Sequence, residues 1–204
     1  MMEASDQKAI TAHLQQLYAD YRHTANIEAK AHFFSPACRQ ICRPRPGFAA
    51  RERETIMRYL REASGEGKAR IQQFIEDTDT PFPTSGPAKK TATDEGTQHK
   101  SFYTIRPLTE GEEEFGNDES AILAGFDSAS SIKLLAENEG WVGMRVDLWD
   151  DEGTGSEGEA LGILVKVQYW WKEGLPGEWS QILHDIMYLG SRDGTEGTQG
   201  QIRE

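Results

Sequence analysis

The chain is poor in cysteine, in long apolar runs and in positive charge, and each shortage excludes a class of protein. Its 204 residues include only Cys38 and Cys42, too few for a disulfide framework or a four-ligand zinc site. No stretch approaches the roughly 20 apolar residues of a membrane-spanning helix. The first ten residues, MMEASDQKAI, lack the positive charge and apolar run of a secretory signal. We therefore expect a cytoplasmic protein that is not a membrane protein.

Basic side chains number 22 against 34 acidic ones, which gives a net charge of −12. Such a surface repels a phosphate backbone and loses the counterion release that drives nucleic-acid binding. The sequence also lacks a phosphate-binding glycine loop, a Gly-x-Ser-x-Gly elbow and paired metal-ligand histidines. It therefore predicts no nucleic-acid or membrane partner and no metal site.

The apolar spacing predicts helices in the first third of the chain. Residues 6–23 form an amphipathic helix whose apolar stripe consists of Ile10, His13, Leu14, Leu17, Tyr18 and Tyr21. Shorter helical segments follow at 26–34, ended by Ser35-Pro36, and at 48–63. Residues 38–44 between them suit an edge strand, because Pro44 and Pro46 follow directly. A further short helix begins at 128 and ends at Gly140.

The rest is predicted as strand and loop. Residues 101–108, 140–151, 160–171 and 178–190 are rich in β-branched and aromatic residues, and the last three have short connections that favour an antiparallel meander. We expect one domain of the α+β class over 1–204, in which N-terminal helices pack on a curved antiparallel sheet. Residues 77–100 read as a mobile insertion, 109–120 as a solvated acidic loop rather than a cation site, and 191–204 as a frayed tail.

Strand parity sorts the side chains of the predicted sheet into two faces. The apolar set, expected to face the helices, is Val142, Met144, Val146, Leu148, Leu161, Ile163, Val165, Val167, Tyr169 and Trp171. The opposite set mixes tryptophans with charges and suits a subunit contact, so we expect a homodimer through Trp141, Arg145, Trp149, Lys166 and Trp170. In the last strand, placing Asp185 beside Arg145 and Lys166 turns His184 inward, next to Tyr188.

This inward face supplies the candidate site. His184 is the candidate acid or base and Tyr188 or Tyr169 the group that polarises an oxygen, while the alternative for His184 is a hydrogen-bonded core histidine. Arg106 suits either an acidic ligand or a structural salt bridge. The predicted substrate-binding residues are Tyr169, Met144, Val146, Val165, Val167, Trp171, Tyr21, Leu17, His13 and Arg106.

Five segments, FFSPACRQICRP, SFYTIRPL, GWVGMRVDLW, LVKVQYWW and LHDIMYLG, together with the order of elements, resemble the SnoaL-like members of the nuclear transport factor 2-like superfamily. The resemblance implies a cone-shaped fold with a deep pocket between sheet and helices, dimerisation through the outer sheet face, and no cofactor. It implies a cyclase, isomerase or dehydratase acting by general acid/base catalysis on a small apolar, polyketide- or terpenoid-like metabolite. The alternative is a noncatalytic binding or scaffold protein of the same fold.

Overall fold

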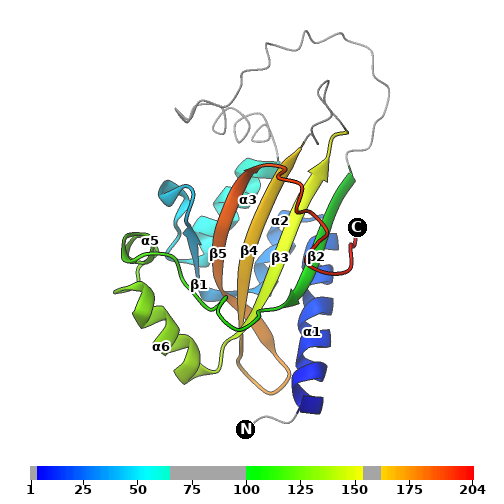
Figure 1. Ribbon diagram of the computed structural model, residues 1–204. Coiled ribbons are helices and arrows are strands. Elements are labelled where there is room, and N and C mark those ends of the chain that lie inside the picture. The colour runs from blue at the N-terminus through cyan, green and yellow to red at the C-terminus, as the bar shows by residue number, and fades with distance from the viewer. Residues whose placement is uncertain (1–3, 65–99, 154–161) are drawn as a thin grey trace.

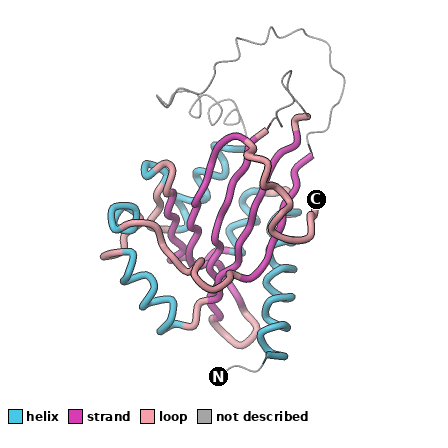
Figure 2. The backbone as a smooth tube through the Cα atoms, in the orientation of Figure 1, coloured by secondary structure: helices cyan, strands magenta, loops and turns pink. Residues whose placement is uncertain are grey.

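The computed structural model describes residues 4–64, 100–153 and 162–204, and helices surround a central sheet in it (Figures 1 and 2). The predicted insertion at 77–100 lies outside the described residues except for Lys100. The helices are α1 (Ala4–His23), α2 (Ile27–Lys30), α3 (Arg53–Ser64), α5 (Asp118–Leu123) and α6 (Ala129–Glu139), with 3-10 turns η1 (Ala31–Phe33) and η2 (Pro46–Phe48).

Five strands form one curved sheet in the order β1-β5-β4-β3-β2. Their bounds are β1 (Phe34–Cys42), β2 (Lys100–Pro107), β3 (Val142–Asp151), β4 (Ile163–Glu173) and β5 (Trp179–Ser191). All neighbours are antiparallel except β1, which lies parallel to β5 at the sheet edge. The α+β class, the edge position of β1 and the β3-β4-β5 meander are therefore confirmed.

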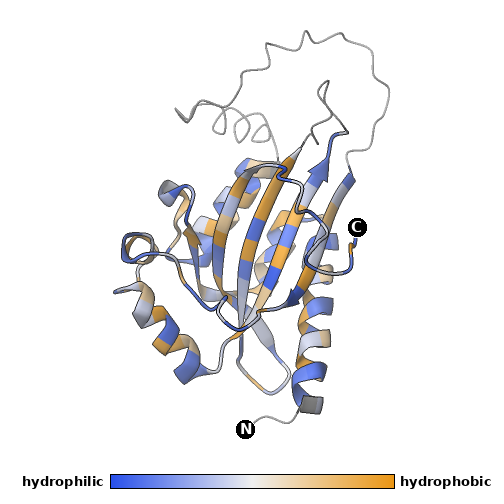
Figure 3. Ribbon diagram, in the orientation of Figure 1, coloured by the Kyte–Doolittle hydropathy of each residue, from blue (hydrophilic) through white to orange (hydrophobic). Residues whose placement is uncertain are grey.

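Each face of the sheet has its own apolar core. Alternating hydropathy is visible along the strands in Figure 3, as expected for strands whose successive side chains point to opposite faces. The inner cluster joins β2, β3 and β4 to α1 and α3, and it includes Leu14, Tyr18 and Ile56. The outer cluster joins the other face to α5 and α6 through residues such as Ile132 and Trp170. The sheet is thus covered on both faces over part of its area.

Local sequence signals explain where α6 begins and ends. Ser128 accepts a hydrogen bond from the backbone N–H of Ser131, and the side chain of Ser131 accepts one from the backbone N–H of Ser128, which makes a reciprocal cap. Gly140 ends the helix in the left-handed region at φ 66°, a conformation that glycine adopts without steric cost. These caps fix the end of α6 beside the start of β3.

The register of β5 is interrupted twice. One extra residue, Ile182, lies between the pairs Trp170–Leu183 and Trp171–Gln181, and a second, Met187, lies where the pairing with β4 shifts again. Each bulge reverses the parity of the side chains beyond it. Strand β1 is interrupted more strongly, because Phe34 pairs with Gln181 and the next pair is Arg39 with Leu183.

The C-terminal segment crosses the outer side of β3 and reaches β2 (Figure 1). Tyr103 and Arg203 exchange two backbone hydrogen bonds, of 2.9 and 2.8 Å. Lys100 forms a 3.1 Å ion pair with Glu204. The prediction of a frayed tail over 191–204 is therefore wrong, because backbone pairing with an edge strand orders a segment whose own composition gives no sign of it.

Candidate functional site

His184 and Tyr169 lie opposite each other on the inner face, as paired residues of β5 and β4. The His184 ring centroid is 4.7 Å from that of Tyr169 and 5.0 Å from that of Phe34, which comes from the edge strand β1. The three side chains are at most 7% exposed. The inward orientation predicted for His184 is thus confirmed, in an aromatic surrounding.

Gln181 sets the tautomer of His184, and burial sets its charge. Nε2 of the imidazole and Oε1 of the Gln181 amide are hydrogen-bonded. Because an amide oxygen only accepts, Nε2 carries the proton and Nδ1 is left as the basic nitrogen. Burial lowers the pKa of His184 to about 3, since the charged imidazolium loses its hydration. The ring is therefore neutral at physiological pH.

Four tyrosines line the same interior. The Tyr18 ring packs against Tyr169 and Tyr103, each with centroids 5.2 Å apart, and against Tyr21 at 5.9 Å. Burial raises the pKa of Tyr18, Tyr21 and Tyr169 above the usual range, because a phenolate is poorly stabilised there. These hydroxyls therefore remain protonated and act as neutral hydrogen-bond donors.

Two buried donor atoms next to this group have no hydrogen-bond partner among the described residues. They are Nε1 of Trp171 and Nε2 of Gln181, and both side chains are 0% exposed. Trp171 and Gln181 are paired across β4 and β5. An unsatisfied buried donor costs about 1–3 kcal/mol, which a bound acceptor would recover.

Most of the predicted substrate-binding residues lie in this inner cluster. Aromatic rings pack against one another in this interior, and the cavities described below and beside the acidic loop are lined by other residues. The predicted residues that the structure brings together with Tyr169 are Leu17, Tyr21, Met144, Val146, Val165, Val167 and Trp171.

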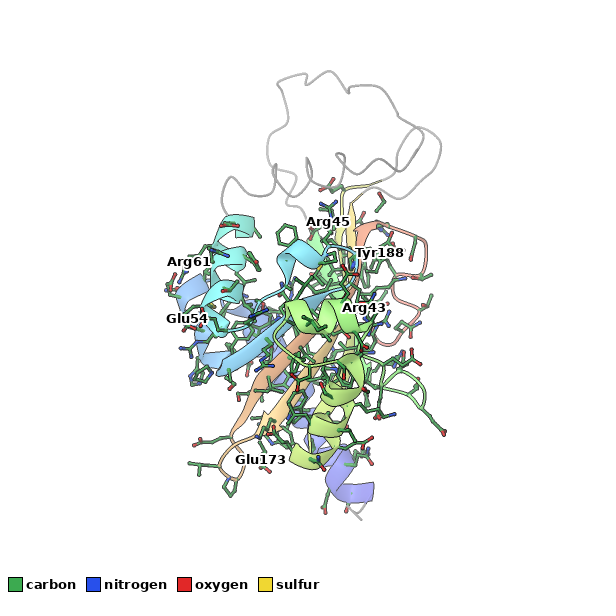
Figure 4. The ribbon with its side chains drawn as sticks, turned by 90° about the vertical axis from the view of Figure 1, so that its left-hand side faces the viewer. Arg43, Arg45, Glu54, Arg61, Glu173 and Tyr188 are labelled. Carbon is green, nitrogen blue, oxygen red and sulfur yellow. The ribbon has the colours of Figure 1, made fainter. Side chains whose placement is uncertain are left out.

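Tyr188 is not beside His184, and that prediction is wrong. The bulge at Met187 turns Tyr188 to the outer face, where it pairs with Lys166. Its hydroxyl donates a 2.8 Å hydrogen bond to the Ser191 carbonyl, and the Lys166 ammonium lies 5.2 Å from its ring centroid. Figure 4 shows Tyr188 at the end of the sheet near the C-terminal segment. It is therefore removed from the interior group.

His13 and Arg106 are also outside the interior, contrary to the prediction. His13 is exposed on α1. Arg106 lies on the outer face and forms a two-pronged ion pair with Glu112, with N–O distances of 2.6 and 2.8 Å. This hydrogen bonding lowers the pKa of Glu112 to about 2. Of the two roles open to Arg106 from the sequence, the structure shows the salt bridge.

The outer-face tryptophans are covered by the chain itself. Trp170 packs at a tilt against Phe115, with centroids 4.8 Å apart, and Trp149 stacks on Phe102, at 6.0 Å. Trp141, Trp149 and Trp170 are at most 9% exposed. The premise of exposed tryptophans is therefore wrong, and a homodimer through this face with Arg145 and Lys166 stays a prediction without that support.

Asp185 faces outward as predicted, but it has a different partner. Arg43, labelled in Figure 4 and just beyond the end of β1, donates to both carboxylate oxygens at 2.9 and 2.6 Å. Asp185 itself is 0% exposed. Arg145 instead pairs with Asp147 at 2.7 Å, and Lys166 with Asp193 at 2.5 Å. The charge balance that oriented this strand therefore gave the correct face.

Phe34 and Gln181 are the interior residues that strand parity did not select. Gln181 is a polar residue next to a bulge, so alternation gives it no special role. Phe34 reads as the end of a helical segment, whereas it begins β1. The signal that could have identified Gln181 is a glutamine close in sequence to a histidine that is predicted to face inward.

Within residues 4–64, 100–153 and 162–204, no group of three or more His, Cys, Asp or Glu side chains is placed to hold a metal ion. Cys38 and Cys42 are free thiols, and burial raises the pKa of Cys42 to about 11. None of the described helices is long and apolar enough to span a bilayer.

A family model, described as SnoaL-like domain, matches residues 3–204, nearly the whole chain. Comparison with curated proteins and with solved structures found no match.

Proposed function

The chain belongs to the SnoaL-like domain family, and from this premise we propose that it is a cofactor-free cyclase, isomerase or dehydratase acting on a small, uncharged, largely apolar metabolite, of the polyketide or terpenoid kind. The observation that carries the proposal is the group around His184, in which a neutral imidazole stands beside two unsatisfied donors in an aromatic interior. A proton-transfer site of this kind needs a base, and it needs donors where negative charge develops.

Each residue of this group has a chemical role in the proposal. Nδ1 of His184 takes a proton from a carbon next to a carbonyl, and Gln181 holds the ring in the tautomer that leaves Nδ1 free to accept it. The indole N–H of Trp171 and the amide N–H of Gln181 stabilise the enolate oxygen that forms. Return of the proton from Nδ1 to another carbon gives an isomer. Alternatively, the enolate carbon attacks a second carbonyl to close a ring, and the alkoxide that forms takes the proton back from Nδ1. The apolar walls bind the carbon skeleton.

Access requires Phe34 to move. Its ring covers His184 from the edge strand β1, and the pairing of β1 with β5 is interrupted just after it. A side chain next to unpaired backbone moves at lower cost than one in a continuous ladder. In this proposal the substrate enters past the Phe34 ring, and return of the ring behind it excludes water.

The test is deuterium uptake from D₂O into a panel of β,γ-unsaturated ketones and 1,3-diketones, followed by NMR with no added cofactor. The wild-type protein is expected to speed exchange, and His184→Gln to lose about 10²-fold or more of that rate. His32→Gln, which changes an exposed histidine, is the matched control. Equal rates for wild type and a folded His184→Gln variant would remove His184 from the mechanism.

A second reading is a noncatalytic binding protein, and the low pKa of His184 favours it. A base whose conjugate acid has a pKa of about 3 is weak at neutral pH. In that case, native mass spectrometry of the protein purified from its own cells finds a bound metabolite, and the same metabolite shows no exchange in D₂O. Trp171→Phe then loses the bound mass, whereas Trp170→Phe on the outer face keeps it.

A further inference from the structure

A cavity of about 370 Å³ lies on the outer face of the sheet, near the end of α6 and the start of β5. Figure 1 shows the positions of these two elements. It is separate from the group around His184, because its lining comes from the opposite side of the strands. Its apolar lining consists of Phe126, Leu135, Trp141 and Ile182. Its charged lining residues are Arg39, Glu139 and Lys172. A cavity of this size suits a ligand of on the order of 10 to 15 heavy atoms.

The interruption of β1 explains why the space is there. Between Phe34 and Arg39 the strand uses five steps where β5 uses two, so Ser35 and Ala37 lie off the regular ladder, and both line the cavity. Pro36, between them, has no backbone N–H to donate. The opening is therefore a consequence of the local sequence rather than of loose packing of α6.

Two of the three charges at the cavity neutralise each other. Nζ of Lys172 lies 2.8 Å from Oε2 of Glu139, and Nε1 of Trp141 donates to the same oxygen at 2.9 Å. The hydrogen bonds from Lys172 and Trp141 lower the pKa of Glu139, so it is ionised at neutral pH. This pair contributes no net charge.

Arg39 is the remaining charge. Its guanidinium carbon lies 4.3 Å from the centroid of Phe126, and Nη1 donates a 2.7 Å hydrogen bond to the Gly125 carbonyl. Among the residues that the structure describes, no carboxylate pairs with it, in a chain with 34 acidic residues. The Phe126 ring and the Gly125 carbonyl hold the guanidinium of Arg39 in place, and its other N–H groups are still available as donors. This arrangement suits a carboxylate.

We propose that this cavity binds a small monoanion with an apolar body, a carboxylic acid whose carboxylate pairs with Arg39 and whose carbon skeleton contacts Trp141 and Ile182. The net charge of −12 repels anions at long range, but this repulsion is screened beyond about 8–10 Å in physiological salt. Inside the cavity the local charge is positive. The site therefore selects an anion that the rest of the surface disfavours.

The experiment compares 4-phenylbutyrate with its amide, 4-phenylbutyramide, by titration calorimetry and by amide NMR shifts of the full chain. The acid is expected to bind at least about tenfold more tightly than the amide, which has the same shape and no charge. Arg39→Gln should reduce binding of the acid to the level of the amide. Arg58→Gln is the matched control, because Arg58 also stacks on a ring, Tyr59, at 5.3 Å, outside the cavity.

Ala37→Phe gives a second test that leaves every charge in place. It fills the cavity from β1 and should abolish binding of both probes. Equal affinity of acid and amide for the wild type, no binding of the acid at millimolar concentration, or binding unaffected by Ala37→Phe each overturns the proposal. His184→Gln should leave 4-phenylbutyrate binding unchanged, so the outcome is independent of the proposed proton transfer.

Discussion

Because His184 is buried, the free energy of unfolding of the protein should fall with decreasing pH. The size of the fall depends on how far burial lowers the pKa of His184. Burial lowers its pKa from 6.5 to about 3, so the folded state resists protonation and the unfolded state does not. For a base with a depressed pKa in the folded state, the contribution to stability is fully present above pH 6.5. It is lost progressively as the pH falls from 6.5 towards 3.

The magnitude follows from proton linkage. One unit of pKa difference corresponds to about 1.4 kcal/mol, and between pH 7.5 and pH 5 the unfolded state protonates while the folded state does not. His184 therefore contributes a loss of roughly 2 kcal/mol over this interval. The buried position makes this conversion appropriate, because the side chain is only 5% exposed.

Urea unfolding of wild type, His184→Gln and His32→Gln at pH 7.5 and pH 5 measures this loss. Groups that titrate elsewhere contribute to all three proteins and cancel in the comparison. The free energy of unfolding should fall by about 2 kcal/mol more in wild type and His32→Gln than in His184→Gln. The same fall in all three proteins would refute the burial of a neutral imidazole.

Three other predictions test the packing. Asp185→Asn leaves Arg43 without its buried carboxylate, and should lower the free energy of unfolding by about 2–4 kcal/mol in urea titrations at pH 7, where a change below about 0.5 kcal/mol contradicts the geometry. Trp170→Asp buries an unpaired charge and should lower the melting temperature sharply; a stable variant that sedimentation shows as a dissociated monomer would favour the outer-face dimer instead. Deleting residues 192–204 should speed hydrogen exchange at the Tyr103 amide, and unchanged exchange would contradict the docked tail.

The fold could be predicted because its signals are local. The stripe of α1, the stop at Gly140 and the alternation in β3 and β4 each depend on neighbouring residues, and the structure keeps them except at His13, which is exposed. The parallel pairing of β1 with β5 could not be predicted, because the sequence of neither strand specifies which strand it pairs with. Long-range pairing is decided by the whole sheet.

Tyr188 shows why strand parity fails beyond a bulge. A single extra residue, Met187, reverses every later side chain of β5, and no glycine or proline marks the position. Placing Asp185 outward was nevertheless sound, because an unpaired buried carboxylate is costly whichever cation supplies the partner. Parity is correct only between the two bulges, from Leu183 to Ile186.

The sequence also did not predict that other segments of the same chain cover the outer face of the sheet. Trp149 and Trp170 beside charges are typical of a subunit contact, yet α5, α6 and the C-terminal segment occupy that face within one chain. The tail carries little apolar surface besides Ile202, so its composition predicts disorder. Two backbone hydrogen bonds to Tyr103, which composition cannot reveal, hold it in place.

Nitrogen-15 NMR of the imidazole of His184 tests the site most directly. With Nε2 bound to Gln181 and the ring shielded from water, the two ring nitrogens should give well-separated shifts, one protonated and one not, that stay constant from pH 7.5 to pH 5. Shifts that converge with a midpoint near pH 6.5 would show a ring open to solvent, and the proposed proton transfer would then have no buried base.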